Sequence, residues 1–387
     1  MRKTPVTGRL LMNWTELSDF LDGIGEKWSI PALECAVTVN HERVFYRAAG
    51  FKDTAKTIPA SDKDLYWIYS VSKLFAVTSA MQLIERGLMK TEDPVSGYLP
   101  SWEHVRVKTA DGSEESRVKP TIFHLLTMTA GLNYELDAPE IKKLRERTKD
   151  RFVLRDLADA LAQAPLDFTP GEHFRYSLCL DVLGAVVEEV SGLAMDEYVR
   201  KYIGDPLGTR DLTFFPSDEQ LRRFSAEYSY DEKTKSCTDA HLHNPFALAP
   251  LLASSGAGLA SGLHDVALLA DALANGGTAS SGRRILTEES IRKMSADCLT
   301  PAQREDFAQM KPRAYSYGFG VRTLTRQVGN VPVGEFGWDG AAGSYVLIDP
   351  GRKLSLVYMQ HVLEHPRCFT ELHIGLRDTL YRIVAGT

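Results

Sequence analysis

The sequence has little cysteine, and its cysteines are not paired in any recognisable way. Their number is odd and their spacing irregular, with no C-x-x-C motif and no histidine at metal-ligand spacing. The five are Cys35, Cys179, Cys237, Cys298 and Cys368. This pattern excludes a disulfide framework and a cysteine-based zinc site, and it favours a reducing, cytoplasmic location. We expect neither a metal ion nor another cofactor.

The chain also lacks an excess of basic residues and long hydrophobic runs. Its 45 Lys and Arg residues against 51 Asp and Glu residues give a net charge of -6, so nucleic acid is not an expected partner. The segment from Met1 to Trp14 has no apolar stretch typical of a signal peptide. The longest uncharged window, residues 244–263, is interrupted by two prolines and three glycines. We expect it to be a buried loop or a short core helix and not a membrane span.

Both ends of the chain predict a hairpin covered by a helix. Apolar residues at helical spacing over 14–28 are followed by β-rich runs at 34–39 and 44–47. Near the C-terminus, two further β-rich runs flank Asp349-Pro350-Gly351-Arg352, a sequence that favours a type II turn. A closing helix then presents one apolar face, formed by Leu372, Leu376, Leu380 and Ile383.

An isolated hairpin is marginally stable in water, so we expect the two terminal hairpins to join one antiparallel sheet. Residues 91–209 show helical patterns separated by polar loops, and a further hairpin near 227–238 indicates a return to the sheet. The expected fold class is α+β. An antiparallel β-sheet flanked by helices is formed by residues 1–90 and 210–387, with an inserted all-helical lobe at 91–209.

Three Ser-x-x-Lys matches occur, and a pattern this short arises by chance about once in a chain of this size. The matches at Ser116 and Ser290 lie in a charged loop and on the polar face of a helix, and we interpret both as solvated surface. The third begins at Ser70, between the apolar run 65–69 and a helix whose apolar residues recur every three or four positions. A serine at the start of such a buried helix is held rigidly.

A serine hydroxyl needs a neighbouring base to become a good nucleophile. Lys73 lies one helical turn from Ser70 and therefore on the same face. Burial and the helix dipole both lower the pKa of an amine at this position, toward that of a useful base. The alternative is that Ser70 caps the helix and Lys73 is a surface lysine, and the motif alone does not decide between them.

Two other segments carry candidate residues. Tyr176 precedes a helix over 178–190, for which Ser177 is a reasonable N-cap, with Asp181 in the first turn. That tyrosine can equally be a packing residue at the boundary between lobes. The glycine-rich segment 337–344 leads into the C-terminal hairpin, where it allows close backbone approach to a ligand or forms a tight strand entry.

In this order and spacing, the three segments resemble the serine-active-site superfamily of class C β-lactamases, penicillin-binding DD-peptidases and their esterase relatives. The likeness covers nearly the whole chain, and the segments 125–132 and 254–259 support it. By position, the resemblance implies that Ser70 is the nucleophile and Lys73 its partner base. It makes Tyr176 the tyrosine that shares proton transfer with the lysine and helps to activate the deacylating water. The N–H groups of Ser70 and Ala341 would form the oxyanion hole.

The implied substrate-binding residues, Trp338, Asp339 and Gly340, depart from the β-lactamase branch. That branch has Lys-Thr-Gly at this place and Tyr-x-Asn at the tyrosine, where this chain has Leu178. An indole and an acid replace the groups that help to hold a β-lactam carboxylate, so we expect a neutral acyl ester to be bound better than an anionic substrate. The sequence Trp-x-Gly is similar to that of the carboxylesterase and acyltransferase relatives at this place.

The sequence therefore predicts a cytoplasmic serine hydrolase that cleaves small carboxylic esters through an acyl-enzyme on Ser70. Its expected partner is a small-molecule acyl ester, without nucleic acid or membrane. Three alternatives stay open: β-lactamase or DD-peptidase-type amide hydrolysis, acyl transfer to an acceptor, and an acylated binding protein that barely turns over. The sequence indicates no particular natural substrate or oligomeric state.

Overall fold

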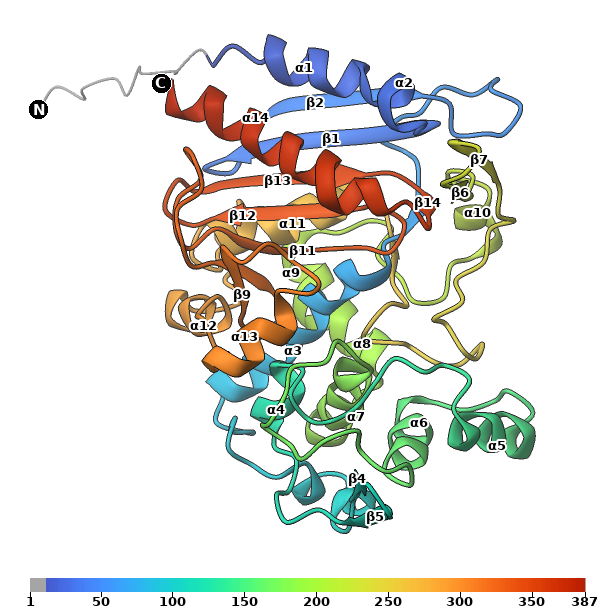
Figure 1. Cartoon of the computed structure of the whole chain (residues 1–387). Helices are drawn as coiled ribbons and strands as arrows, with labels where there is room; N and C mark the ends of the chain where they lie inside the picture. Colours follow the sequence, from blue (N-terminus) through green and yellow to red (C-terminus); the bar gives the residue numbers. More distant parts are fainter. Residues whose placement is uncertain (1–11, 387) are drawn as a thin grey trace, which may run out of the picture.

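A computed structural model describes residues 12–386, so most of the N-terminal segment examined for a signal peptide lies outside the described residues. The main element is a seven-stranded antiparallel sheet with the strand order β2-β1-β13-β12-β11-β10-β9 (Figure 1). Its strands are β1 (Ala32–Val39), β2 (Glu42–Gly50), β9 (Tyr315–Tyr317), β10 (Arg322–Leu324), β11 (Phe336–Asp339), β12 (Tyr345–Asp349) and β13 (Leu354–Met359).

The two ends of the chain meet in this sheet, as predicted. Strand β1 pairs antiparallel with β13, with Val37 opposite Leu356. Helices cover both faces (Figure 1), which explains why nearly every residue of β1 is buried. One face carries α1 (Thr15–Asp22), α2 (Ile24–Trp28) and α14 (His373–Ala385), and the other carries α11 (Leu263–Ala274). The expected α+β class with a helix-flanked antiparallel sheet is confirmed.

Two local expectations at the chain ends need correction. The helix expected over 14–28 is divided into α1 and α2 at Gly23. In the β12–β13 turn, Lys353 and not Gly351 adopts the left-handed conformation, with a φ of 51°. The turn is therefore not type II, which requires a positive φ at its third position. The apolar face of the closing helix is buried as predicted.

The regular elements of residues 91–209 are mostly helices, but the segment also contains a short hairpin of β4 (Arg106–Thr109) and β5 (Gly112–Glu115), so the expectation of an all-helical segment is wrong. The division of the chain into lobes at residues 90 and 209 stays a prediction. The helices of this segment are α4 (Ile122–Leu126), α5 (Pro139–Thr148), α6 (Leu154–Leu161), α7 (Cys179–Ser191), α8 (Met195–Val199) and α9 (Asp205–Leu207).

Small sheets and short helices join these parts. The hairpin expected near 227–238 is present, and its first strand pairs in parallel with β14, just after β13. These strands are β6 (Tyr228–Asp231), β7 (Ser236–Asp239) and β14 (Val362–Leu363), while β3 (Tyr66–Trp67) pairs with β8 (Ala260–Ser261). Three short helices also lie in this part of the chain: α10 (Asp218–Leu221), α12 (Glu288–Met294) and α13 (Pro301–Phe307).

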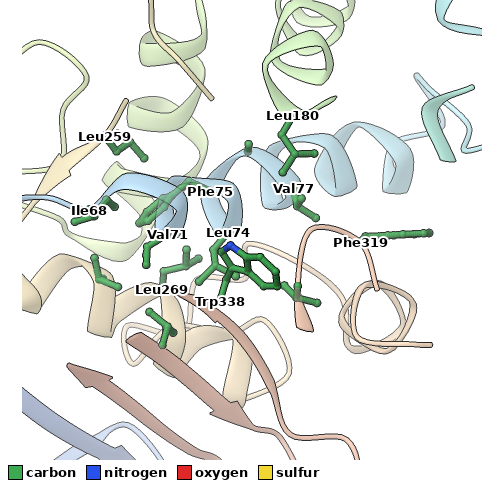
Figure 2. Close-up of a cluster of buried hydrophobic side chains, with 14 of the residues drawn as sticks. Ile68, Val71, Leu74, Phe75, Val77, Leu180, Leu259, Leu269, Phe319 and Trp338 are labelled. Atoms are coloured by element: carbon green, nitrogen blue, oxygen red, sulfur yellow. The ribbon is translucent and has the colours of Figure 1, made fainter. Parts of the chain in front are cut away.

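Helix α3 (Ser72–Glu85) runs through the interior of the molecule and holds the first candidate residues. Its residues from Ser72 to Leu83 are all buried. Figure 2 shows part of the apolar cluster around it, with Leu74 and Phe75 from α3, Leu180 from α7, Leu269 from α11 and Trp338 from the sheet. A helix enclosed on all sides in this way holds its N-terminal turn in one position.

The uncharged window at 244–263 is a loop up to residue 259, followed by β8 and the first residue of α11, and its residues from 252 onward are buried. Among residues 12–386, no helix has both the length and the apolar character needed to cross a membrane. The cytoplasmic location inferred from the cysteines stays a prediction.

Candidate active site

Ser70 lies in a single 3₁₀ turn, Tyr69–Val71, immediately before α3. It does not cap the helix, because the N-cap position of α3 is Val71 and no side chain caps it. The alternative reading of Ser70 as an N-cap is therefore wrong. The hydroxyl borders a cavity while the residue as a whole is 9% exposed. The positive end of the α3 dipole faces this turn and stabilises negative charge that develops there.

Lys73 is completely buried behind Ser70, so the alternative of a surface lysine is also wrong. Its Nζ lies 3.2 Å from Ser70 Oγ and 2.8 Å from the carbonyl oxygen of Gly256. Burial lowers the pKa of Lys73 to about 7, although the Asp181 carboxylate acts in the opposite direction. Near neutral pH the amine is therefore available in its unprotonated form, with its lone pair able to take a proton from Ser70.

The carbonyl that accepts from Lys73 is positioned by Asp181. One carboxylate oxygen of Asp181 accepts hydrogen bonds from Ser254 Oγ at 2.6 Å and from the Gly256 N–H at 3.2 Å. A Cβ atom at position 256 would lie 2.5 Å from the other oxygen of Asp181, so the close approach requires glycine. The sequence reading placed Asp181 correctly in the first turn of α7 but did not find this supporting role.

Tyr176 lies beside Ser70, and its hydroxyl accepts a hydrogen bond from Trp338 Nε1 at 3.1 Å. The two rings are stacked, with centroids 5.4 Å apart. Burial raises the pKa of the phenol above its usual value, despite hydrogen bonds with Ser70 and Trp338 that act in the opposite direction. Ser177 was expected to cap α7, but Leu178 occupies the N-cap position and the Ser177 hydroxyl contacts Cys179 Sγ.

Tyr134 is a site residue that the sequence reading missed. Its hydroxyl lies 3.5 Å from Lys73 Nζ, and its ring stacks on that of Tyr176 with centroids 5.5 Å apart. Lys73 Nζ also lies 4.6 Å from the centroid of the Tyr176 ring, so both aromatic rings surround the amine. The only signal in the sequence was its place, two residues after the segment 125–132 that supported the family resemblance.

The candidate oxyanion donors lie where a strand end meets the nucleophile turn. Gly340 follows β11, and a Cβ atom there would approach the Ile68 carbonyl oxygen to 2.5 Å, so the two backbones are in close contact. Ser70 and Ala341 line the same cavity. Within residues 12–386, neither of their amides donates to a backbone carbonyl. Both N–H groups are therefore free to bind a developing oxyanion.

The cavity has a volume of about 590 Å³ and brings together six of the seven residues that were expected at the site. The seventh, Lys73, lies behind Ser70. Aromatic and apolar side chains form most of the wall. Its lining residues are Ser70, Tyr134, Tyr176, Phe246, Met310, Lys311, Trp338, Asp339, Gly340, Ala341, Pro366, Phe369 and Thr370.

The negative charge of Asp339 is compensated by two cations that the sequence analysis did not place at the site. Asp339 forms ion pairs with Lys311 and, at 3.0 Å, with Arg322. Burial alone would raise its pKa, but the two cations lower the pKa of Asp339 to about 2. The cavity therefore does contain a lysine, which comes from the segment after α13 and not from the position two residues before Gly340. The wall of the cavity is close to electrically neutral here.

Removing Arg322 tests this charge network. Its side chain also lies 3.2 Å from Glu335, and all three groups are buried. We expect Arg322→Met to lower the free energy of unfolding by about 3–5 kcal/mol at pH 7, because Glu335 and Asp339 each lose a buried cation, although Asp339 keeps its ion pair with Lys311. The difference in the free energy of unfolding between the wild type and Arg322→Met should narrow as the pH falls from 3.8 toward 2, where Asp339 becomes protonated in both proteins. Urea unfolding measures both effects.

The matched control for this variant is Arg313→Met. Arg313 pairs with Glu305, but both side chains are more than 60% exposed. Its loss should change the free energy of unfolding by less than about 1 kcal/mol. An equal loss of stability in the two variants would contradict the assigned role of Arg322.

A second cavity of about 600 Å³ adjoins the first, since Tyr176 and Met310 line both. Its wall is more polar and includes Asp167, Arg175 and Asp306. The two cavities therefore share part of their wall and differ in polarity.

The other two Ser-x-x-Lys matches do not form such a site. Ser116 is half-buried, and its hydroxyl donates to the Val118 carbonyl. Ser290, expected to be solvated, is buried and contacts Thr287 in the N-terminal turn of α12, whereas Lys293 pairs with Glu289 at the surface. Among the residues that the structure describes, no group of three or more His, Cys, Asp and Glu side chains is placed to hold a metal ion.

Comparison with known proteins identifies the family of the chain. Residues 17–379 match the family described as Beta-lactamase. The chain belongs to this family. Proteins similar to this chain in sequence include some named as esterases and acyltransferases. Esterase EstB of Burkholderia gladioli is 36% identical over 200 residues, which cover 50% of this chain and 49% of EstB.

Solved structures show the same likeness over nearly the full length. The structure of "EstCE1, a hydrolase with promiscuous acyltransferase activity" has a TM-score of 0.78 at 25% identity and covers 95% of this chain and 98% of its own. Simvastatin synthase from Aspergillus terreus has a TM-score of 0.79 at 20% identity, covering 94% of this chain and 97% of its own, and shows the shared fold. The chain is thus a β-lactamase-fold member of a serine hydrolase and acyltransferase family.

Proposed function

We propose that the protein is a serine hydrolase of small, neutral carboxylic esters. The observation that carries this proposal is the buried amine of Lys73, 3.2 Å from Ser70 Oγ and with a pKa of about 7. A base with a pKa near the working pH combines a high fraction of the unprotonated form with useful proton affinity.

In the acylation step, the proton of the Ser70 hydroxyl passes to Lys73 Nζ as Oγ forms a bond with the ester carbonyl carbon. The carbonyl oxygen becomes negative and is held by the N–H groups of Ser70 and Ala341. When the bond to the alcohol oxygen breaks, the ammonium of Lys73 returns a proton to it. Water then repeats the sequence on the acyl-enzyme and releases the acid, leaving Ser70 with its proton.

Tyr176 supports both half-reactions as a proton carrier in its neutral form. Its raised pKa argues against a phenolate base, so Lys73 is the group that removes the proton. The Trp338 N–H fixes the position of the phenol oxygen next to Ser70. From there the tyrosine hydroxyl can relay a proton between the lysine and the leaving alcohol or the incoming water.

The preference for neutral esters follows from the cavity wall. Phe246, Trp338 and Phe369 supply apolar surface for an acyl group. The ion pair of Lys311 with Asp339 adds no net charge. A negatively charged group on the substrate would gain little attraction from this wall and would lose its hydration.

A panel of p-nitrophenyl esters of increasing acyl length, run beside nitrocefin, tests this assignment. We expect the highest kcat/KM among short uncharged acyl groups and much slower nitrocefin turnover. Nitrocefin turnover equal to that of the best ester would favour the β-lactamase alternative. A burst of one equivalent without a steady state would favour the acylated binding protein.

Acyl transfer is a second candidate function, and the likeness to EstCE1 favours it. An acyl-enzyme on Ser70 can react with an alcohol in place of water. Adding a primary alcohol to the ester assay should then yield the new ester at the expense of the free acid. Product analysis that finds acid alone at high alcohol concentration would exclude transfer.

The size of the alcohol that fits depends on Met310, which lies between the two cavities. We expect Met310→Trp to lower kcat/KM about tenfold for esters of bulky polar alcohols, because the indole blocks the way into the second cavity. Methyl esters of the same acid should change less than about twofold. Met310→Leu, which nearly conserves volume, is the control. Equal losses for both kinds of ester would contradict this placement of the alcohol.

A further inference from the structure

The residue before the candidate nucleophile has an unusual backbone conformation. Tyr69 has a φ of +46°, in the left-handed region that bulky residues rarely adopt. Its side chain is completely buried. Such a conformation persists where surrounding contacts hold it. Because Tyr69 and Ser70 share a peptide bond, those contacts also set the direction of the Ser70 N–H.

The contact that holds Tyr69 is a buried carboxylate. The Tyr69 hydroxyl donates a hydrogen bond to Glu227 Oε1, and Glu227 is 1% exposed. Two other groups meet the same carboxylate. The N–H of His243 donates to Oε2 at 3.0 Å, and His361 Nε2 lies 3.2 Å from Oε1. Burial would raise the pKa of Glu227, but its contacts with His361, His243 and Tyr69 lower it, so the group stays ionised.

His361 connects this carboxylate to the other candidate oxyanion donor. Its neighbours on both sides bind one carbonyl: Gln360 Nε2 donates to the Ala342 oxygen at 3.2 Å, and the Val362 N–H donates to it at 3.0 Å. Ala342 follows Ala341 directly in the chain. The segment 360–362 therefore fixes the Ala342–Gly343 peptide, two peptides after the one that contains the Ala341 N–H.

The pairing of two short strands brings Glu227 and His361 together. Strands β6 and β14 pair in parallel with Tyr228 beside Val362, so the residues that precede them, Glu227 and His361, are also neighbours (Figure 1). His361 Nδ1 faces the Ser225 carbonyl at 3.0 Å, which fixes the orientation of its ring. Neither β6 nor β14 contributes a side chain to the reacting atoms, and no sequence motif pointed to this pair.

We propose that Glu227 and His361 are positioning residues that set the relative placement of the two oxyanion N–H groups. Glu227 holds Tyr69, and thereby the amide of Ser70. His361 anchors the segment that holds Ala342, and thereby the amide of Ala341. The two donors lie on chain segments about 270 residues apart, so their separation needs such a direct link. This inference rests on the proposed ester hydrolysis at Ser70.

The test uses Tyr69→Phe, which removes the hydroxyl and keeps the buried ring. We expect kcat to fall about tenfold to a hundredfold with KM changed less than about twofold, since the loss concerns the transition state. The affinity for phenylboronic acid, whose serine adduct places a boron-bound oxygen in the oxyanion hole, should fall in parallel. Glu227→Gln should act in the same direction and serves as the second variant if Tyr69→Phe does not fold.

The matched control is Tyr381→Phe. This tyrosine is equally buried and donates at 3.0 Å to Asp349, at the end of β12 away from Gly340. It should lose stability without any change in kcat or in boronate affinity. If folded Tyr69→Phe and Glu227→Gln keep wild-type kcat and boronate affinity while Ser70→Ala is inactive, the positioning role is wrong and the ester hydrolase assignment stands. If Ser70→Ala retains activity, the proposed function itself fails.

Discussion

Replacing Ser70 by alanine should lower the turnover of p-nitrophenyl esters by about four to six orders of magnitude. The nucleophile belongs to a catalytic unit, and removing it leaves only the contribution of the oxyanion donors and of binding. The variant should fold normally, because the hydroxyl borders a cavity and caps no helix. The assay follows p-nitrophenolate release at pH 8 with purified wild type and variant.

Ser290→Ala is the matched control for this experiment. Ser290 begins another Ser-x-x-Lys sequence and is buried, but its neighbour Lys293 is paired with Glu289 at the surface. Ester turnover should be unchanged in this variant. A Ser70→Ala protein that keeps more than about 1% of wild-type activity would contradict the assignment of the nucleophile.

The second large effect is expected for Lys73→Met, which should lower kcat/KM by about 10²–10⁴-fold at pH 7. In the wild type, the active form of Lys73 is the neutral amine. Since its pKa is about 7, kcat/KM should rise tenfold per pH unit below 7 and level off above it. The residual activity of Lys73→Met should lack this rise. A wild-type profile that is flat between pH 5.5 and 8 would contradict Lys73 as the base.

Lys73→Met should also raise the free energy of unfolding. The pKa of Lys73 is about 7 in the folded protein and near 10.5 when exposed, so unfolding takes up a proton between these values. The folded wild type therefore gains stability as the pH rises from 7 toward 10.5, and it carries the full cost of a buried charge below 7. Lys73→Met removes that cost. The free energy of unfolding of Lys73→Met, measured in urea, should exceed that of the wild type most below pH 7, and the excess should shrink toward pH 10. A gain in stability together with a loss of activity is expected at a functional site.

Local spacing made part of the site predictable from the sequence. Ser70 and Lys73 are three residues apart, one in the 3₁₀ turn and the other in the first turn of α3, and this spacing places them on the same side. The terminal hairpins could be predicted for a similar reason, since each has a strong strand pattern and a short turn. Their joining in one sheet followed from the instability of a lone hairpin.

The other site residues depend on contacts between distant segments, which a single sequence does not specify. Lys311 reaches Asp339 from the segment after α13, and Tyr134 reaches Lys73 from the segment before α5. Glu227 lies beside His361 because β6 pairs with a strand more than 130 residues later, and its carboxylate accepts from Tyr69, which is 158 residues earlier in the chain. The charge balance of the cavity wall could not be predicted for this reason: the acid at position 339 was visible in the sequence, but its partners Lys311 and Arg322 were not.

The central claim, an acyl-enzyme on Ser70, is tested most directly by mass spectrometry of the protein quenched in acid during steady-state turnover of a short p-nitrophenyl ester. We predict a mass increase equal to the acyl group, located by peptide fragmentation on Ser70. It should be absent from Ser70→Ala and retained in Ser290→Ala. Turnover without an adduct on Ser70 under quenching that preserves esters, or an adduct that forms equally in Ser70→Ala, would contradict the account.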